Sequence, residues 1–508
     1  MAKNEKGVAL ILTLILLLIL SVMAISLLFM GQAETWSSMN YRMMTQARYG
    51  AEAGINQAAN YIQNSYTSPT TAQMASFNTA VSPVTAGGAP VILSASGTAA
   101  NYPVSAVSSD FATKATGTIR AGNTTVTYAP SAKLLAMQSF QSYPSATTAV
   151  VQKWEITSDG TINGVRKADV QVSAIMEQQK MSTFAYAAFA TATGCSAMSF
   201  GGGGSTDSYD SASITYDNKG NPITQSYGGN VGTNGNLSES GSKTTINGSL
   251  STPRSGTGTC STSTVTAVSV NGNATLTGGI TELPQNVTYT TPPAPSPAPP
   301  TTSMSIQKSA SCPISTNCTA SGADTVITGG TSSTTATLLG NVSLDSQANL
   351  HFAAPACSAA ATPVYINMNS IQVTGNATIT VDPIQCPSGT VTTKYPEIIL
   401  NVAGSGVTAP IDLTGSTLTN PSLNPADFQL LYAGTGQVTL NGGSAAAGLL
   451  YAPNASFKLN GGGNWYGAVI AGLITDLGGG AIHYDRELQK EFYSVGPYML
   501  STFNWQKY

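Results

Sequence analysis

The chain has 508 residues, enough for two or three domains, and a net charge of −3. Charged residues make up only 8% of it, far below their share in a soluble cytosolic protein. Lysine and arginine gather nowhere into a basic patch, which argues against nucleic-acid binding. With so few charges, hydroxyl and amide groups must keep the surface polar. This pattern favours an exported, β-rich protein.

The N-terminus combines a short polar segment with a long apolar run. Residues 1–7 are polar and include Lys3 and Lys6, whereas residues 8–30 contain no charge. As a helix rising 1.5 Å per residue, the apolar run would be roughly 34 Å long, which is enough to cross a bilayer. The lysines precede the run and Glu34 follows it, so we expect a single span with its N-terminus inside the cell.

Three processing routes fit this arrangement. A secretory signal would be cleaved after Ala24, a plain anchor would stay uncleaved, and a prepilin would be cleaved between Gly7 and Val8. The apolar run passes Ala24 and the helical pattern continues beyond it, which a signal peptide does not need. A plain anchor does not explain a glycine at the border between polar and apolar residues. We therefore favour cleavage after Gly7.

The helical pattern extends to residue 64. After residue 31, apolar residues recur at spacings of three and four, which places them on one helix face. They are Trp36, Met39, Met43, Ala47, Ala51, Ile55, Ala58 and Ile62. We predict one helix over residues 8–64. Its first part, which includes Val8, Leu12, Leu20 and Met30, would lie in the membrane, and its second part would pack under a sheet.

This N-terminus resembles that of PilX-type minor pilins. The resemblance rests on residues 6–11, the apolar run and Ala51-Glu52-Ala53-Gly54. It implies that prepilin peptidase cleaves after Gly7 and that Val8 becomes the new, usually methylated, N-terminus. Major pilins carry a glutamate at the fifth mature position, which is Leu12 here. Because that glutamate offsets a buried charge in the filament, its loss favours a minor, priming or tip subunit.

Residues 65–190 are predicted to form a pilin-like α+β domain with a small antiparallel sheet. Its β-favouring segments are punctuated by turn signals at 158–160 and 163–164. The stretch 154–179 resembles the last hairpin of PilX-type domains. A short helix is expected at 133–142.

Residues 191–490 repeat short β-favouring segments separated by Asn-Gly or Gly-Asn turns. A spacing of about 20 residues suits one coil of a solenoid, so we predict a large, all-β, right-handed-type β-solenoid, with a β-sandwich as the alternative. Residues 449–453, 465–468 and 483–485 resemble the β-helical domain that often follows a PilX-type N-terminus. The Pro-rich segment 283–304 is interpreted as a loop of the solenoid, with a linker between domains as the alternative, and 491–508 as a cap or tail.

The side chains offer little reactive chemistry. Six cysteines permit up to three disulfides in an exported chain, with reduced thiols as the alternative. We predict that Cys312 and Cys318 pair, and the other pairings stay open. With only two histidines and no zinc-type spacing, we expect no metal and no cofactor. The carboxylates are scattered, so we expect no catalytic residues and no enzyme activity.

Together these features predict a minor pilin-like subunit of a type IV pilus or related filament, acting in assembly, priming or tip adhesion. Expected partners are other pilins and minor pilins, prepilin peptidase, the inner membrane and a surface or tip adhesin. The body would lie outside the cytoplasm and then on the pilus or cell surface. The alternatives are a membrane-anchored β-solenoid adhesin outside any filament and an extracellular carbohydrate-active enzyme.

Overall fold

The computed structural model divides the chain into two compact units. It describes residues 5–507 except 97–98, 123, 146, 165–166, 219, 242–243, 272–273, 310, 346, 358–362, 374, 387–393, 442–445 and 477. Unit 1 consists of Met1–Gln141, Thr148–Met181 and Val495–Tyr508. Unit 2 consists of Ser142–Thr147 and Ser182–Ser494. The last segment of the chain thus joins unit 1, where we had expected a cap or tail.

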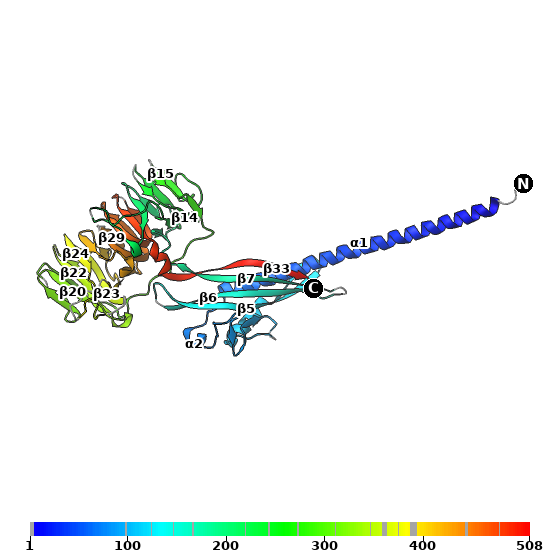
Figure 1. Ribbon diagram of the computed structural model, residues 1–508, viewed down its shortest axis with the longest axis horizontal. Coiled ribbons are helices and arrows are strands. Elements are labelled where there is room, and N and C mark those ends of the chain that lie inside the picture. Colours follow the sequence, from blue (N-terminus) through cyan, green and yellow to red (C-terminus); the bar gives the residue numbers. More distant parts are fainter. Residues whose placement is uncertain are drawn as a thin grey trace. The chain divides into compact units, whose positions relative to one another are not determined.

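Unit 1 is built on the long N-terminal helix α1 (Glu5–Asn64), as the sequence predicted. Its first half is exposed, and burial begins near residue 43. From there the predicted face packs on the sheet, with Ala47, Ala51 and Ile55 completely buried. Figure 1 shows α1 continuing well beyond the strands that it packs against.

A mostly antiparallel sheet covers the second half of α1. Its order is β3-β5-β33-β7-β6, with β4 paired to β5 and small elements beside it. The bounds are α2 (Thr71–Met74), β1 (Thr85–Ala86), β2 (Ala89–Pro90), β3 (Ile92–Ser94), α3 (Ser105–Ala115), β4 (Gly117–Ala121), β5 (Thr124–Ser142), β6 (Thr147–Ile162), β7 (Ala168–Ser182) and β33 (Tyr493–Lys507). The predicted hairpin at 154–179 is the β6–β7 pair.

Three local expectations in this unit are wrong, the first being the turn at 158–160, which lies inside strand β6 and pairs with β7. The helix expected at 133–142 is the second half of strand β5, because Ala132 and Leu134 alternate into the core and β3 pairs alongside. The tail forms β33, whose Tyr498 packs on the core of unit 1 and donates a hydrogen bond from its hydroxyl to Gln152 Oε1 (3.2 Å). Neither contact is visible in a local sequence window.

Close approach between α1 and the sheet depends on small residues. Gly160 of β6 lies against the helix, where a Cβ atom would collide with the Ala47 carbonyl oxygen and the Ala51 nitrogen. Gly50 and Gly54 of α1 likewise lie against Val126 and Ser158. Glycine here is a packing requirement, which explains why a helix-weakening residue occurs in mid-helix.

Unit 2 consists mainly of short parallel strands. Its first part contains β8 (Ala188–Ala190), β9 (Met198–Phe200), β10 (Ser205–Tyr209), η1 (Ser211–Ser213), β11 (Val231–Thr233), β12 (Leu237–Ser240), β13 (Thr245–Ile246), β14 (Leu250–Thr252), β15 (Val268–Asn271), β16 (Thr275–Leu276) and β17 (Ile280–Glu282). Each group of three strands pairs in parallel with the next group along the chain.

The second part of unit 2 continues the same pattern with longer strands. Its main-sheet elements are β18 (Ser303–Ile306), β21 (Thr337–Leu344), β23 (Pro363–Val373), β25 (Glu397–Val402), β26 (Ile411–Asp412), β28 (Phe428–Tyr432), β29 (Gln437–Asn441), β30 (Ala447–Asn460), β31 (Asn464–Asp476) and β32 (Ala481–Asp485). A second sheet holds β19 (Cys318–Ser321), β20 (Asp324–Thr328), β22 (Asn349–Ala353), β24 (Ala377–Val381) and β27 (Ser416–Thr419). Short turns are η2 (Ser333–Thr335), η3 (Pro425–Asp427) and η4 (Arg486–Lys490).

The two parts meet where β31 pairs in parallel with β8. The spatial order is therefore β21, β23, β25, β28, β30, β31, β8, β11, β14 and β17. Along the sequence, the chain enters this order in the middle, at β8, and continues to β17 at one end. It then starts again at the other end with β18 and β21. Buried aliphatic side chains stack in register through this order: Leu400, Leu430, Leu450, Val469, Ala188, Val231 and Leu250.

A Pro-rich connection, residues 283–302, links β17 to β18 across these strands. Side chains of the strands and turns bind its backbone in chain order. Asn234 Nδ2 donates to Val287 O (2.8 Å), Tyr451 Oη to Thr290 O (2.7 Å), Asn367 Nδ2 to Pro297 O (2.8 Å) and Asn341 Nδ2 to Thr301 O (2.7 Å). A Pro-rich segment forms no regular ladder of backbone hydrogen bonds, and its prolines lack N–H donors. Its carbonyl groups therefore need other donors, which these side chains supply.

Candidate functional site

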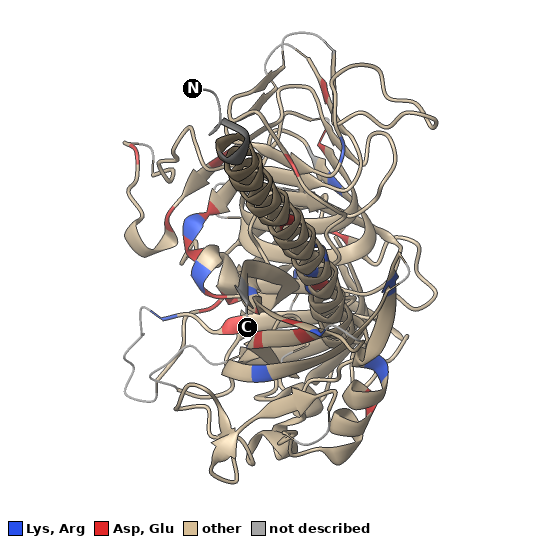
Figure 2. Ribbon diagram, turned by 90° about the vertical axis from the view of Figure 1, so that its right-hand side faces the viewer, with Lys and Arg blue, Asp and Glu red and all other residues tan. Residues whose placement is uncertain are grey.

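The main candidate site is the exposed half of α1. Every large apolar side chain from Val8 to Met30, including Leu12 and Leu20, is at least half exposed. By length and composition the helix can cross a membrane. Burying one such side chain is worth about 1.5–3 kcal/mol, so this surface needs a cover, either lipid or the helices of other subunits. Figure 2 shows the near part of the helix without basic or acidic residues.

The few polar side chains in this stretch are compatible with an apolar cover. The Thr13 hydroxyl donates to the Ala9 carbonyl oxygen (3.0 Å), and the Ser21 hydroxyl donates to the Leu17 carbonyl oxygen (2.7 Å). Each hydroxyl is satisfied within the helix itself, which is what a hydrocarbon environment demands.

The predicted processing residues lie at the start of α1. Gly7 and Val8 belong to the helix backbone, which begins at Glu5, and the Val8 side chain is exposed. Residues 1–4 of the predicted leader, with Lys3, fall outside the described residues.

Both histidines contact aspartates in unit 2. His351 Nδ1 lies 2.8 Å from Asp382 Oδ1, and this hydrogen bond raises the pKa of His351. His483 Nδ1 lies 2.5 Å from Asp207 Oδ1, and its ring stacks on Tyr466. Its Nε2 has no hydrogen-bond partner among the described residues. Both pairs join neighbouring strands, and His351 Nε2 also lies 3.7 Å from Asp324 Oδ1.

Buried carboxyl groups were missed by the sequence reasoning. Glu239 and Asp476 flank Phe200 in register on adjacent strands, and all three are completely buried. Burial raises the pKa of each carboxyl group to about 7. The only sign of this burial in the sequence is the period-two alternation of the strand, which places Glu239 on the same face as the buried Leu237. Among the described residues, no group of three or more His, Cys, Asp or Glu is placed to hold a metal ion.

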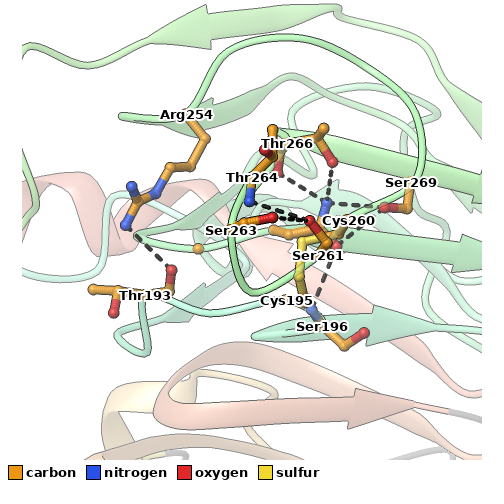
Figure 3. The surroundings of a disulfide bond; sticks show 12 residues. Thr193, Cys195, Ser196, Arg254, Cys260, Ser261, Ser263, Thr264, Thr266 and Ser269 are labelled. Carbon is orange, nitrogen blue, oxygen red and sulfur yellow. Dashed lines mark hydrogen bonds between the residues drawn. A yellow bond between two sulfur atoms is a disulfide. The ribbon is translucent and has the colours of Figure 1, made fainter.

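The structure joins Cys312 to Cys318, Cys195 to Cys260 and Cys357 to Cys386. Figure 3 shows that Cys195–Cys260 ties the loop before β15 to the segment after β8. In the same place Arg254 Nη2 donates to the Thr193 carbonyl oxygen (3.2 Å). The sequence spacing left this pairing open, because its two cysteines are 65 residues apart.

Two family models match parts of the chain, and one of them covers most of this helix. Residues 6–56 match the model of the PilX N-terminal family, and residues 362–491 match a domain of unknown function, DUF7305. A solved structure, the competence-associated pilin ComZ from Thermus thermophilus, aligns over 91% of this chain and 97% of its own at 14% identity and a TM-score of 0.27. The comparison with curated proteins gave no match.

The exposed apolar helix lies within the family match, so the N-terminal segment of this chain is pilin-related. Its N-terminal segment is of the PilX type, so the resemblance found in the sequence is confirmed. An anchoring helix of this kind fits attachment to a membrane and display on a pilus.

Proposed function

We propose that this protein is a minor pilin-like subunit of a type IV pilus or related filament. Prepilin peptidase cleaves it after Gly7, and Val8 becomes the methylated N-terminus. Before assembly the protein spans the inner membrane once, with its body outside the cytoplasm. Then α1 packs among the helices of other pilins and minor pilins. The observation that carries this proposal is the uncovered apolar half of α1 within the PilX match.

The position of Leu12 favours a priming or tip role, including contact with a surface or a tip adhesin. Within an apolar bundle a charged amine at Val8 needs a carboxylate partner. In major pilins the fifth mature position supplies it, but here that position is Leu12, whose side chain is aliphatic. A subunit at the tip of a filament contacts other subunits on one side only, so that position can accommodate a body as large as unit 2.

We further infer that unit 2 is a β-solenoid of the right-handed type. Its strands pair in parallel with the next group along the chain, and inward aliphatic side chains stack in register. A β-sandwich would instead bring antiparallel neighbours together. We also propose that the protein is not an enzyme, because the histidine–aspartate pairs serve as contacts between strands.

Mass spectrometry of the N-terminus tests the pathway. Protein from native membranes should begin at Val8 when the peptidase is present and at Met1 when it is deleted. A Gly7→Val variant should also begin at Met1, whereas Gly31→Ala, at the far end of the apolar run, should be processed normally. A chain that always begins at Met1 would contradict the proposal and leave an anchored surface adhesin. A start near Ile25 would indicate a secreted protein.

Copurification distinguishes a filament subunit from an anchored adhesin. A filament subunit should be recovered with other pilins after shearing of the cell surface. An adhesin outside any filament should remain with the membrane fraction.

A further inference from the structure

One end of the strand order in unit 2 is incomplete. Strands β8–β10, β11–β13 and β14–β16 form three successive groups, and each group pairs in parallel with the next. Strand β17 begins a fourth group by pairing with β14. The chain then leaves as the Pro-rich connection. Among the described residues, no strand therefore lies on the outer side of β15, β16 or β17, away from the preceding groups.

Three side chains at this end are the last members of stacks whose preceding members are buried. The pairs in register are Val270 with Glu239, Leu276 with Ile246, and Ile280 with Leu250. The preceding member of each pair is completely buried, whereas Val270 is 50% exposed, Ile280 is 41% exposed and Leu276 is half-buried. We call these three side chains the open end. Their apolar surface is what a further layer would remove from water.

The backbone at the open end also directs hydrogen-bonding groups outward. In a parallel pair of strands, alternate residues bond to one neighbour, and the residues between them point to the other side. The N–H groups of Thr275 and Thr277 donate to carbonyl oxygens of the preceding group, at 3.1 Å in each case. The backbone groups of Leu276 therefore point outward, where no described strand lies. An edge of this kind is a template for pairing with another strand.

The other end of the strand order shows what kind of segment such an end accepts. There the chain adds β18 in parallel to β21, and Ile306 of β18 is completely buried. In the neighbouring sheet, β19 covers the outer side of β20 beside the Cys312–Cys318 disulfide. Extended segments thus complete that end. At the open end, the cover among the described residues is limited to the start of β15, where Thr257 bridges to Val268.

We propose that the open end binds an extended segment of a partner protein, which adds to β16 and β17 as a further parallel strand. Alternate residues of that segment are aliphatic and cover Leu276 and Ile280. The segment carries a glycine at the corner between β16 and β17, because a Cβ atom added at Gly248 or Gly278 would meet the backbone of the preceding layer. This inference concerns unit 2 alone and does not depend on N-terminal processing.

The probe is a fluorescent peptide with the sequence of residues 244–252, which form the layer that precedes β16 and β17. It carries Ile246 and Leu250 in the register that the open end requires. We expect saturable binding to the full-length protein in detergent, measured by fluorescence anisotropy. Ile280→Ser should weaken binding about tenfold, because the peptide no longer covers an aliphatic side chain there. The matched control Leu473→Ser, at an equally exposed position (41%) of β31, should bind as the unchanged protein does.

Methylated peptides distinguish strand pairing from general apolar contact. In the protein, the N–H group of Asn247 donates to the Thr206 carbonyl oxygen of the preceding layer (3.0 Å), whereas the N–H group of Ile246 points to the opposite side. A peptide with an N-methyl group at Asn247 should therefore bind at least about tenfold more weakly. A peptide with an N-methyl group at Ile246 should bind as the unmethylated peptide does. This comparison uses the unchanged protein, so it does not depend on how a variant folds.

Several outcomes would overturn the proposal. They are the absence of saturable binding, equal binding by the two methylated peptides, and equal binding by the Ile280→Ser and Leu473→Ser proteins when both keep the melting temperature of the unchanged protein. A full-length protein that is dimeric in detergent and becomes monomeric in Ile280→Ser would also overturn it, because the occupant would then be a second copy of this chain. None of these outcomes changes the result of N-terminal processing.

Discussion

Units 1 and 2 bury their apolar surface in different ways. Unit 1 packs long antiparallel strands, such as the 19-residue β5, against the alanine-rich face of one helix. Unit 2 stacks short parallel strands with aliphatic ladders between them, and it contains all six cysteines as disulfides. The comparison teaches that a chain with few charges can be stabilised either by close helix-on-sheet packing or by cross-linked stacking. Each mode has its own weak points.

The largest effect should come from the long-range disulfide of unit 2. Replacing Cys195 and Cys260 by serine removes a cross-link over 65 residues, which lowers the free energy of unfolding of unit 2 by about 4 kcal/mol. Calorimetry should show the transition of unit 2 moving down and that of unit 1 staying in place. Replacing Cys312 and Cys318, only 6 residues apart, should cost about 2 kcal/mol. A joint shift of both transitions would show that the units are not independent.

The matching weak point of unit 1 is Gly160. An added Cβ meets the backbone of α1 at Ala47 and Ala51, and backbone cannot move aside as a flexible side chain can. Gly160→Ala should therefore destabilise unit 1 by about 3 kcal/mol. Gly31→Ala, where a Cβ meets open space, should change stability by less than about 1 kcal/mol. An unchanged melting transition in Gly160→Ala would mean that helix and sheet are not in such close contact.

Unit 2 should also lose stability as pH rises. The pKa of Glu239 is raised to about 7 in the folded protein, whereas an unfolded glutamate titrates near about 4.3. The folded state thus holds a proton that the unfolded state has released, so the stabilisation is present at low pH and lost as pH rises through 7. Denaturant unfolding should show unit 2 less stable at pH 8 than at pH 5, by up to about 3 kcal/mol for this group.

The variant Glu239→Gln should remove the share of that dependence that Glu239 contributes, because an amide does not titrate, while Asp476, whose pKa burial also raises to about 7, keeps its own share. Glu282→Gln, at an exposed position of β17, is the matched control and should keep the full pH dependence. If both variants behave alike, the buried carboxyl group is not the cause.

The smallest effect concerns the Pro-rich connection. Asn234 both donates to and accepts from the Val287 backbone, at 2.8 Å in each case. Asn234→Ala should cost about 1–2 kcal/mol and speed proteolysis within residues 283–302. Asn286→Ala, at the exposed neighbouring position, should do neither. Equal cleavage rates in the two variants would show that the amide contacts do not hold the connection.

The sequence by itself determined the features that depend on local pattern. The uncharged run 8–30 and the spacing of Ala47, Ala51 and Ile55 define α1, because helical periodicity and bilayer length are read within one window. The turn signal at 163–164 likewise marked the β6–β7 hairpin, whereas the one at 158–160 lies inside β6. The PilX-type segment was recognised for the same reason.

Only the tertiary structure decided which distant segments meet. It placed β31 beside β8 and β33 in the sheet of unit 1, and it joined Cys195 to Cys260. It also made residues 133–142 a strand, since pairing with β3 and burial in the core of unit 1 outweigh local helix preference. These choices depend on free energies of burial and hydrogen bonding between residues far apart in the chain, and no local pattern of the sequence carries them.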